Sequence, residues 1–229
     1  MFFGSVFPYP GSAYSFCFHY VHNHYMYILS FLFFVLIFSN MMSILGGYSF
    51  KFNFVRNDSR VIELGLQILI INCLILMAGP GFWLIQYQGR MFYQPELSLK
   101  IIGHQWYWSY EFTDVEGLRY DSFMKSLDEL VPGESRMLDV DNRCVVPVDV
   151  NLGLYCTSSD VIHSFALPKC FIKMDALNGI LTKITYHFPV VGVFYGQCSE
   201  MCGANHSFMP VVLEVTSLEC WKSWALGFF

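Results

Sequence analysis

Apolar positions run without a charged residue through two long stretches in the first half of the chain. The first extends from Tyr25 to about Tyr48 and the second from Leu64 to Gln88. As helices both are long enough to cross a bilayer, which needs roughly 20 residues. The pattern therefore predicts a transmembrane helical hairpin over residues 25–90, with spans at 25–48 and 64–88. Pro80, between two glycines, predicts a kink in the second span because proline removes an intrahelical hydrogen bond.

Basic residues predict how this hairpin is oriented. The segment between the spans carries Lys51, Arg56 and Arg60, whereas residues 1–24 carry no lysine or arginine. The positive-inside rule then places the connecting loop on the inner side and the two ends of the chain on the outer side. Glu63 lies at the inner edge of the second span. A carboxylate at that depth is either a functional group for proton uptake or an interfacial group that reaches water, and its position favours neither.

Beyond residue 90 the helical pattern gives way to short runs of β-branched and aromatic residues. Turn sequences separate these runs at 131–133, 141–142 and 177–179, and Pro147 marks an edge strand or a bulge. Such spacing predicts an all-β sandwich or Greek-key barrel over residues 91–229. Within the run 103–112, alternation places Trp106 and Trp108 on one strand face and Tyr107 on the other.

Composition agrees with a chain that is part membrane and part water-facing. Only 14% of the 229 residues are charged, against about 25% in soluble domains. Residues 91–160 contain twelve acidic and five basic side chains, which argues against nucleic acid as a partner. This acidic surface is either simply solvated or steers a basic protein partner. The candidate docking residues are Glu111, Asp114, Glu116, Asp121, Asp141 and Asp160.

Eight cysteines are dispersed along the chain, and most lie in apolar surroundings. This distribution does not fit a small disulfide scaffold. Cys198 and Cys202 alone form a close pair, in the stretch "GQCSEMCGANHSFMP" over residues 196–210.

That stretch also holds His206 and Met209, so four metal-capable side chains lie within twelve positions. The spacing differs from the Cys-x2-Cys knuckle of structural zinc sites. Cysteine, histidine and a weak methionine ligand are the donors of electron-transfer copper sites, and His163, 35 residues upstream of Cys198, is the candidate remote ligand. Alternatively, the cysteines form a disulfide or pack in the core, while the histidine and methionine have ordinary structural roles.

A second cysteine changes the expected chemistry. Two thiolates four residues apart can bridge two copper ions, with Met209 and a backbone carbonyl near Glu200 as weak ligands. The transferred charge is then shared by two metals, so bond lengths change little. Such a site suits one-electron transfer, because it leaves no coordination position open for a substrate.

Three long motifs carry a family resemblance: "GHQWYWSYEF" at 103–112, "DVIHSFALP" at 160–168 and "YGQCSEMCGANHSFMP" at 195–210. Together with the hairpin, they resemble subunit II of the haem–copper cytochrome c oxidases, in particular the mitochondrial ones. The resemblance covers nearly the whole chain. It implies an α+β membrane protein, in which the two-helix hairpin precedes a cupredoxin-like Greek-key domain.

The resemblance also implies roles for particular residues. Cys198 and Cys202 would bridge the two copper ions of a CuA centre, with His163, His206 and Met209 as further ligands. Glu200 would offer its carbonyl to copper and its carboxylate to a magnesium ion shared with subunit I. Trp106 would receive electrons from cytochrome c, and Glu63 would stand near a proton-uptake route.

The expected function is electron input to an oxidase that reduces oxygen to water and pumps protons. The oxygen-reducing site would lie on subunit I rather than on this chain. The expected location is the mitochondrial inner membrane, in contact with lipid, with the β domain in the intermembrane space.

Two features depart from the family pattern. Met201 stands where isoleucine is expected, and residues 1–24 carry His19, His22 and His24, which we interpret as part of a polar interfacial segment on the outer side. Three other functions remain as alternatives: a copper-free quinol-oxidase subunit, a copper carrier, and a CuA domain like that of nitrous oxide reductase. The intact ligand set argues against the first, the acidic face and the Trp106 motif against the second, and the helical hairpin against the third.

Overall fold

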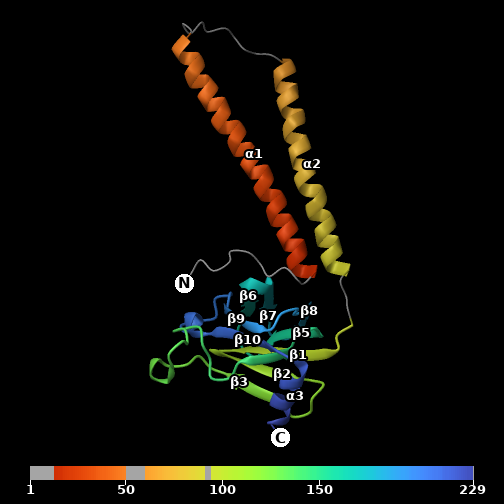
Figure 1. Cartoon of the computed structure of the whole chain (residues 1–229), viewed down its shortest axis with the longest axis vertical. Coiled ribbons are helices and arrows are strands. Elements are labelled where there is room, and N and C mark those ends of the chain that lie inside the picture. Colours follow the sequence, from red (N-terminus) through yellow and green to blue (C-terminus); the bar gives the residue numbers. More distant parts are fainter. Residues whose placement is uncertain (1–12, 50–59, 91–93, 229) are drawn as a thin grey trace. The chain divides into compact units, whose positions relative to one another are not determined.

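The computed structural model describes residues 13–49, 60–90 and 94–228, which form two compact units (Figure 1). The first unit contains two long helices, α1 (Ala13–Ser49) and α2 (Arg60–Arg90). Segments Asn23–Met41 and Glu63–Trp83 within them are long and apolar enough to cross a membrane. The predicted pair of apolar helices is therefore confirmed.

Helix α1 begins at Ala13, twelve positions before the predicted span. His24 consequently lies inside a helix rather than in a separate leading segment. Helix α2 continues through Pro80, and Glu63 is exposed on its first turn. Lys51 and Arg56, on which the predicted orientation partly rests, lie outside the described residues.

The second unit is a β domain with three sheets. Its five-stranded sheet has the order β3-β2-β1-β5-β8, its three-stranded sheet the order β4-β10-β9, and its two-stranded sheet pairs β6 with β7. The strands are β1 (Leu97–His104), β2 (Tyr107–Phe112), β3 (Arg119–Ser122), β4 (Cys144–Pro147), β5 (Asn151–Ser158), β6 (His163–Leu167), β7 (Ile172–Ala176), β8 (Thr182–His187), β9 (Gly192–Gln197) and β10 (Pro210–Thr216). Short 3-10 turns η1 (Leu127–Glu129), η2 (Pro168–Cys170) and η3 (His206–Phe208) lie between them.

A single apolar core joins these sheets. It combines Trp108 and Leu99 of the five-stranded sheet with Val211 and Leu213 of the three-stranded sheet and Phe165 of β6. The final helix, α3 (Leu218–Leu226), adds its buried face to this core. Helix α3 is fixed there because the Trp221 indole donates a hydrogen bond of 3.1 Å to the Val145 carbonyl. The domain thus has the β-sandwich core that the sequence predicts.

Local expectations about turns are largely confirmed, with one correction. The three predicted turn segments fall between strands, and Pro147 ends the edge strand β4. Trp106, however, does not share a strand face with Trp108. In the β1–β2 register His104 faces Tyr107, so Gln105 and Trp106 form the two-residue turn between these strands. The prediction failed because strand alternation does not extend through a tight turn.

Strand β9 passes very close to strand β6 at Gly196. A Cβ atom at Gly196 would lie 1.8 Å from the Ala166 carbonyl oxygen, which is far inside van der Waals contact. The neighbouring backbone provides the obstacle, so a side-chain rotation cannot relieve the clash. Only glycine allows this crossing.

We therefore expect Gly196→Ala to destabilise the β domain by about 1–3 kcal/mol or more, the usual cost of overpacking a core. Gly192→Ala on the same strand is the matched control, since the nearest atom would be 4.0 Å from its Cβ. Thermal unfolding of the full chain in detergent, followed by near-ultraviolet circular dichroism, measures both. Equal unfolding midpoints for the two variants would contradict the close crossing.

Candidate metal centre

Two separate elements form the candidate metal centre. Strand β6 contributes His163 as its first residue, and the loop from Cys198 to Met209 connects β9 with β10. The base of this loop is closed by a hydrogen bond of 3.0 Å from the Cys198 N–H to the Met209 carbonyl. The Ser199 N–H donates to the Ser164 carbonyl at 2.9 Å, which ties the loop to β6.

These elements bring soft donor atoms together. His163, Cys198 and Cys202 are all buried, and their ligand atoms lie within 4.8 Å of one another. His163 Nδ1 is 3.9 Å from Cys198 Sγ, and His206 Nδ1 is 3.4 Å from Cys202 Sγ. Each sulfur therefore has one imidazole nitrogen beside it.

The distance between the two sulfur atoms is 3.9 Å. A disulfide bond, at about 2.05 Å, is thus not formed. Two sulfurs that share a tetrahedral metal at a bond length of about 2.3 Å lie about 3.8 Å apart. The observed spacing fits two thiolates that coordinate the same metal, so the residues present suit a copper site.

The remaining loop residues surround this cluster. The Glu200 carbonyl oxygen lies 3.3 Å from Cys198 Sγ, whereas the Glu200 side chain is exposed. Met209 is 1% exposed and lies at the closed base of the loop. The loop thus directs a backbone carbonyl inward at Glu200 and leaves its carboxylate free to reach outward.

Asp160 orients the His163 ring. Asp160 Oδ1 lies 2.8 Å from His163 Nε2, so this nitrogen faces the carboxylate and Nδ1 faces the sulfurs. Burial opposes protonation of His163, but its contacts with Cys198 and Asp160 outweigh burial and raise its pKa. Burial acts against the Asp160 anion, yet hydrogen bonds from His163 and from the Gln105 and Val161 N–H groups lower the Asp160 pKa.

The two thiols differ in acidity in the metal-free protein. Burial disfavours the Cys198 thiolate, but hydrogen bonding, first from His163, lowers the Cys198 pKa to about 6. Burial and the negative charge of Cys198 raise the pKa of Cys202. The pair therefore loses its first proton at Cys198 and holds the second more tightly.

Trp106 lies directly beside the metal loop. Its indole Nε1 donates to the Cys202 carbonyl at 3.3 Å, and the Gln105 side-chain amide donates to the same oxygen at 2.9 Å. Gly203, with φ at +119°, turns the chain beneath this contact, and a Cβ there would lie 3.2 Å from the indole ring. The half-buried indole is thus one hydrogen bond from the backbone of a candidate ligand.

The candidate docking acids do not all lie together. Asp160 accepts the Gln105 N–H at 2.7 Å, and Asp121 sits opposite Ser109 in the β2–β3 register. Asp141 accepts the Phe123 N–H at 2.7 Å, directly after β3. Of these three acids, Asp160 contacts the β1–β2 turn that carries Trp106, whereas Asp121 and Asp141 contact Ser109 and Phe123. The other three are further from that turn, with Glu111 near the opposite end of β2 and Asp114 and Glu116 in the turn beyond that end.

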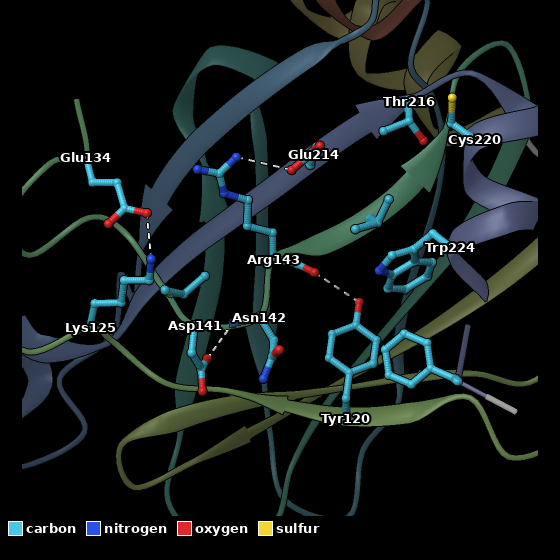
Figure 2. A pocket seen from close by; sticks show the side chains of 13 residues that line it. Tyr120, Lys125, Glu134, Asp141, Asn142, Arg143, Glu214, Thr216, Cys220 and Trp224 are labelled. Atoms are coloured by element: carbon cyan, nitrogen blue, oxygen red, sulfur yellow. Dashed lines mark hydrogen bonds and ion pairs between the residues drawn. The ribbon is translucent and has the colours of Figure 1, made fainter. Parts of the chain in front are cut away.

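A cavity of about 500 Å³ lies elsewhere on the β domain (Figure 2). Arg143 and Lys125 line it, but both are already engaged in ion pairs. Arg143 bonds Glu214 at 3.2 Å, and Lys125 bonds Glu134 at 2.5 Å. None of the candidate metal ligands contributes to this cavity. The candidate metal centre is therefore separate from this cavity.

A β-sandwich that clusters two cysteines and two histidines, in a chain that also carries a pair of apolar helices, defines a class. It is a membrane-anchored protein with a cupredoxin-like domain of the electron-transfer type.

Comparisons with known proteins identify the family. A family model described as cytochrome c oxidase subunit II, periplasmic domain, matches residues 97–216. The cytochrome c oxidase subunit 2 of Ascaris suum is 55% identical over 179 residues, which cover 78% of this chain and 77% of that protein. The Caenorhabditis elegans protein of the same name is 50% identical over 190 residues, with coverages of 81% and 82%.

A solved structure agrees with this relationship. The periplasmic domain of subunit II of the Bradyrhizobium japonicum cytochrome oxidase aligns with a TM-score of 0.56 and 40% identity, covering 60% of this chain and 96% of that chain. The chain therefore belongs to the cytochrome c oxidase subunit II family and is the electron-input subunit of such an oxidase. The predicted family and cupredoxin-like fold are confirmed.

Two contributions to the site were missed at the level of sequence. Gln105 contacts Cys202 through its side chain and Asp160 through its backbone, so it connects both halves of the metal centre. Asp160 was assigned to docking, although its carboxylate also holds His163. The Asp-x-x-His spacing could have suggested the second contact, because a metal-binding histidine usually directs its other nitrogen at such a partner.

The thiol acidities predict selective alkylation in the metal-free chain. Iodoacetamide modification of Cys198, measured by mass spectrometry across pH, should rise through a midpoint near the pKa of about 6, while Cys202 stays slow at neutral pH. The exposed Cys220 reports reagent activity in the same sample. Replacing His163 with Phe should move the Cys198 midpoint upward. A Cys198 midpoint at the ordinary thiol value of about 8.5 would contradict the prediction.

Proposed function

We propose that this chain holds two copper ions in a CuA centre and takes up electrons from cytochrome c. Cys198 and Cys202 would bridge the metals, with one histidine beside each sulfur and Met209 and the Glu200 carbonyl as weak ligands. The observation that carries the proposal is the paired arrangement of His163 with Cys198 and His206 with Cys202. Bound there, the copper pair would supply one-electron redox chemistry at a site closed to substrates.

The protein's own residues limit how far this site moves when its charge changes. Asp160 fixes the His163 ring, and hydrogen bonds to Ser164 and Met209 fix the loop backbone. Thiolate deprotonation accompanies metal binding, and the lowered pKa of Cys198 favours the ligand form at neutral pH. A rigid ligand set needs little reorganisation between oxidation states, which favours rapid electron transfer.

Trp106 is the proposed point of electron uptake. Its indole is partly exposed and donates to the backbone of Cys202, so a short bonded path leads from the surface to a candidate ligand. Asp160 accepts a hydrogen bond from Gln105 of this turn, and Asp121 and Asp141 carry further negative charge at the end of β3 and in the loop after it. We assign these three, together with Glu111, Asp114 and Glu116, to the docking of basic cytochrome c, with association that weakens as salt rises.

The other assignments concern the rest of the oxidase. Subunit I would receive the electrons at its haem, and the Glu200 carboxylate would join a magnesium ion shared with that subunit. Glu63 would serve the mouth of a proton-uptake route. The location would be the mitochondrial inner membrane, in contact with lipid and further oxidase subunits, with the β domain in the intermembrane space. Reduction of oxygen to water and the coupled proton pumping would take place in the assembled oxidase.

Copper binding by the separate β domain tests the central proposal. The corresponding domain of a relative has been crystallised alone, so residues 91–229 can be prepared in the same way. We expect metal analysis to find two coppers per domain and electron paramagnetic resonance to show one electron shared by two copper nuclei. Cys202→Ser should abolish that shared signal. Hyperfine coupling to a single copper nucleus in the unaltered domain, or stoichiometric zinc, would contradict the proposal.

Replacement of Trp106 separates electron uptake from copper binding. In the assembled oxidase, Trp106→Ala should slow electron uptake from cytochrome c by an order of magnitude or more and leave the copper signal nearly unchanged. Stopped-flow kinetics measures the first and electron paramagnetic resonance the second. Trp224→Ala, on α3, is the control for loss of an indole. A collapsed copper signal in the Trp106 variant would instead assign that indole a structural role.

A further inference from the structure

Pro80 leaves one backbone carbonyl of α2 without its usual partner. In a regular helix each carbonyl accepts from the N–H four residues later. Proline has no N–H, so the carbonyl of Leu76 receives no such bond. Within a bilayer an unsatisfied carbonyl is costly, because no water is present to replace the missing donor.

The other helix provides a donor at this position. His24 Nε2 of α1 lies 2.9 Å from the Leu76 carbonyl oxygen, across 52 residues of sequence. A carbonyl oxygen can only accept, so Nε2 must carry the proton and donate. The bond therefore joins a polar side chain of one helix to the carbonyl that proline frees on the other.

The partly covered side chains of α1 and α2 show that the two helices contact each other around His24 and Leu76. Among the helix side chains that the structure describes, those partly covered are Asn23, His24, Tyr25 and Ile28 on α1 and Cys73, Met77, Pro80 and Gly81 on α2. The α2 positions follow a helical spacing of three and four and so form one face. The hydroxyl of Tyr25 lies over Gly81, where an added Cβ would be 2.9 Å from it.

We propose that His24 is a positioning residue that satisfies the Leu76 carbonyl freed by Pro80 and so fixes where the two helices meet. Pro80 and His24 form one unit: the proline creates the acceptor and the histidine supplies the donor. The donor is therefore needed only because the proline frees the carbonyl. The histidine thus has a structural role within the hairpin, apart from any contact at the membrane surface.

The Leu76 carbonyl can be observed directly in the full chain. Leu76–Met77 is the only Leu–Met pair in the sequence. Labelling with carbonyl-¹³C leucine and ¹⁵N methionine therefore isolates one carbonyl resonance, whose ¹³C shift moves upfield when a hydrogen bond is lost. His24→Phe removes the donor at similar size, and Met26→Phe introduces the same ring at an exposed neighbouring position as a control.

We expect His24→Phe to move the Leu76 resonance upfield and Met26→Phe to leave it unchanged. Pro80→Ala restores an N–H, so in that background His24→Phe should no longer move the resonance. An unchanged resonance in His24→Phe, or an equal upfield shift with and without Pro80, would overturn the proposal.

Recovery of folded protein gives a second measure. If His24→Phe does not fold, circular dichroism of the purified chains in detergent compares its helix content with that of the double variant His24→Phe/Pro80→Ala. A failure rescued by Pro80→Ala would support the proposal, and a failure that persists in the double variant would count against it.

Discussion

The candidate metal centre depends on the close crossing of strands β6 and β9. Gly196 brings its backbone against the Ala166 carbonyl with no room for a side chain. That approach places the loop after β9 beside His163 at the start of β6, and the Ser199–Ser164 hydrogen bond extends the contact into the loop. Without this crossing, the cysteines and the remote histidine would belong to separate parts of the sandwich.

Pairing of polar groups shapes both units of the chain. In the β domain, Asp160 takes up one nitrogen of His163 and leaves the other for the sulfurs. In the hairpin, His24 donates a hydrogen bond to the Leu76 carbonyl, which has no helical donor because of Pro80. In both places a hydrogen-bond partner fixes the direction of a histidine ring. Away from water, a polar group without such a partner costs more free energy than a paired one.

Much of the fold follows from pattern alone, and the reasons are local. Uninterrupted apolar runs predict the two helices, and short alternating runs predict the β domain. Both predictions succeed because helix and strand formation depend on residues that are close in the sequence. The turn at Gln105 and Trp106 was missed, since "HQWYWSYEF" alternates in composition although the chain reverses within it. The start of α1 was also missed, because the uncharged residues before Tyr25 carry polar histidines that resemble an interfacial segment.

The sequence by itself determined the types of donor and their order: two cysteines, a histidine and a methionine in one loop, with a second histidine upstream. It could do so because metal chemistry restricts both residue types and spacing. Only the tertiary structure decided which groups face one another across long separations. Asp160 with Gln105, Trp106 with Cys202, and His24 with Leu76 are contacts set by the packing of whole strands and helices. No local pattern in the chain encodes such a distance.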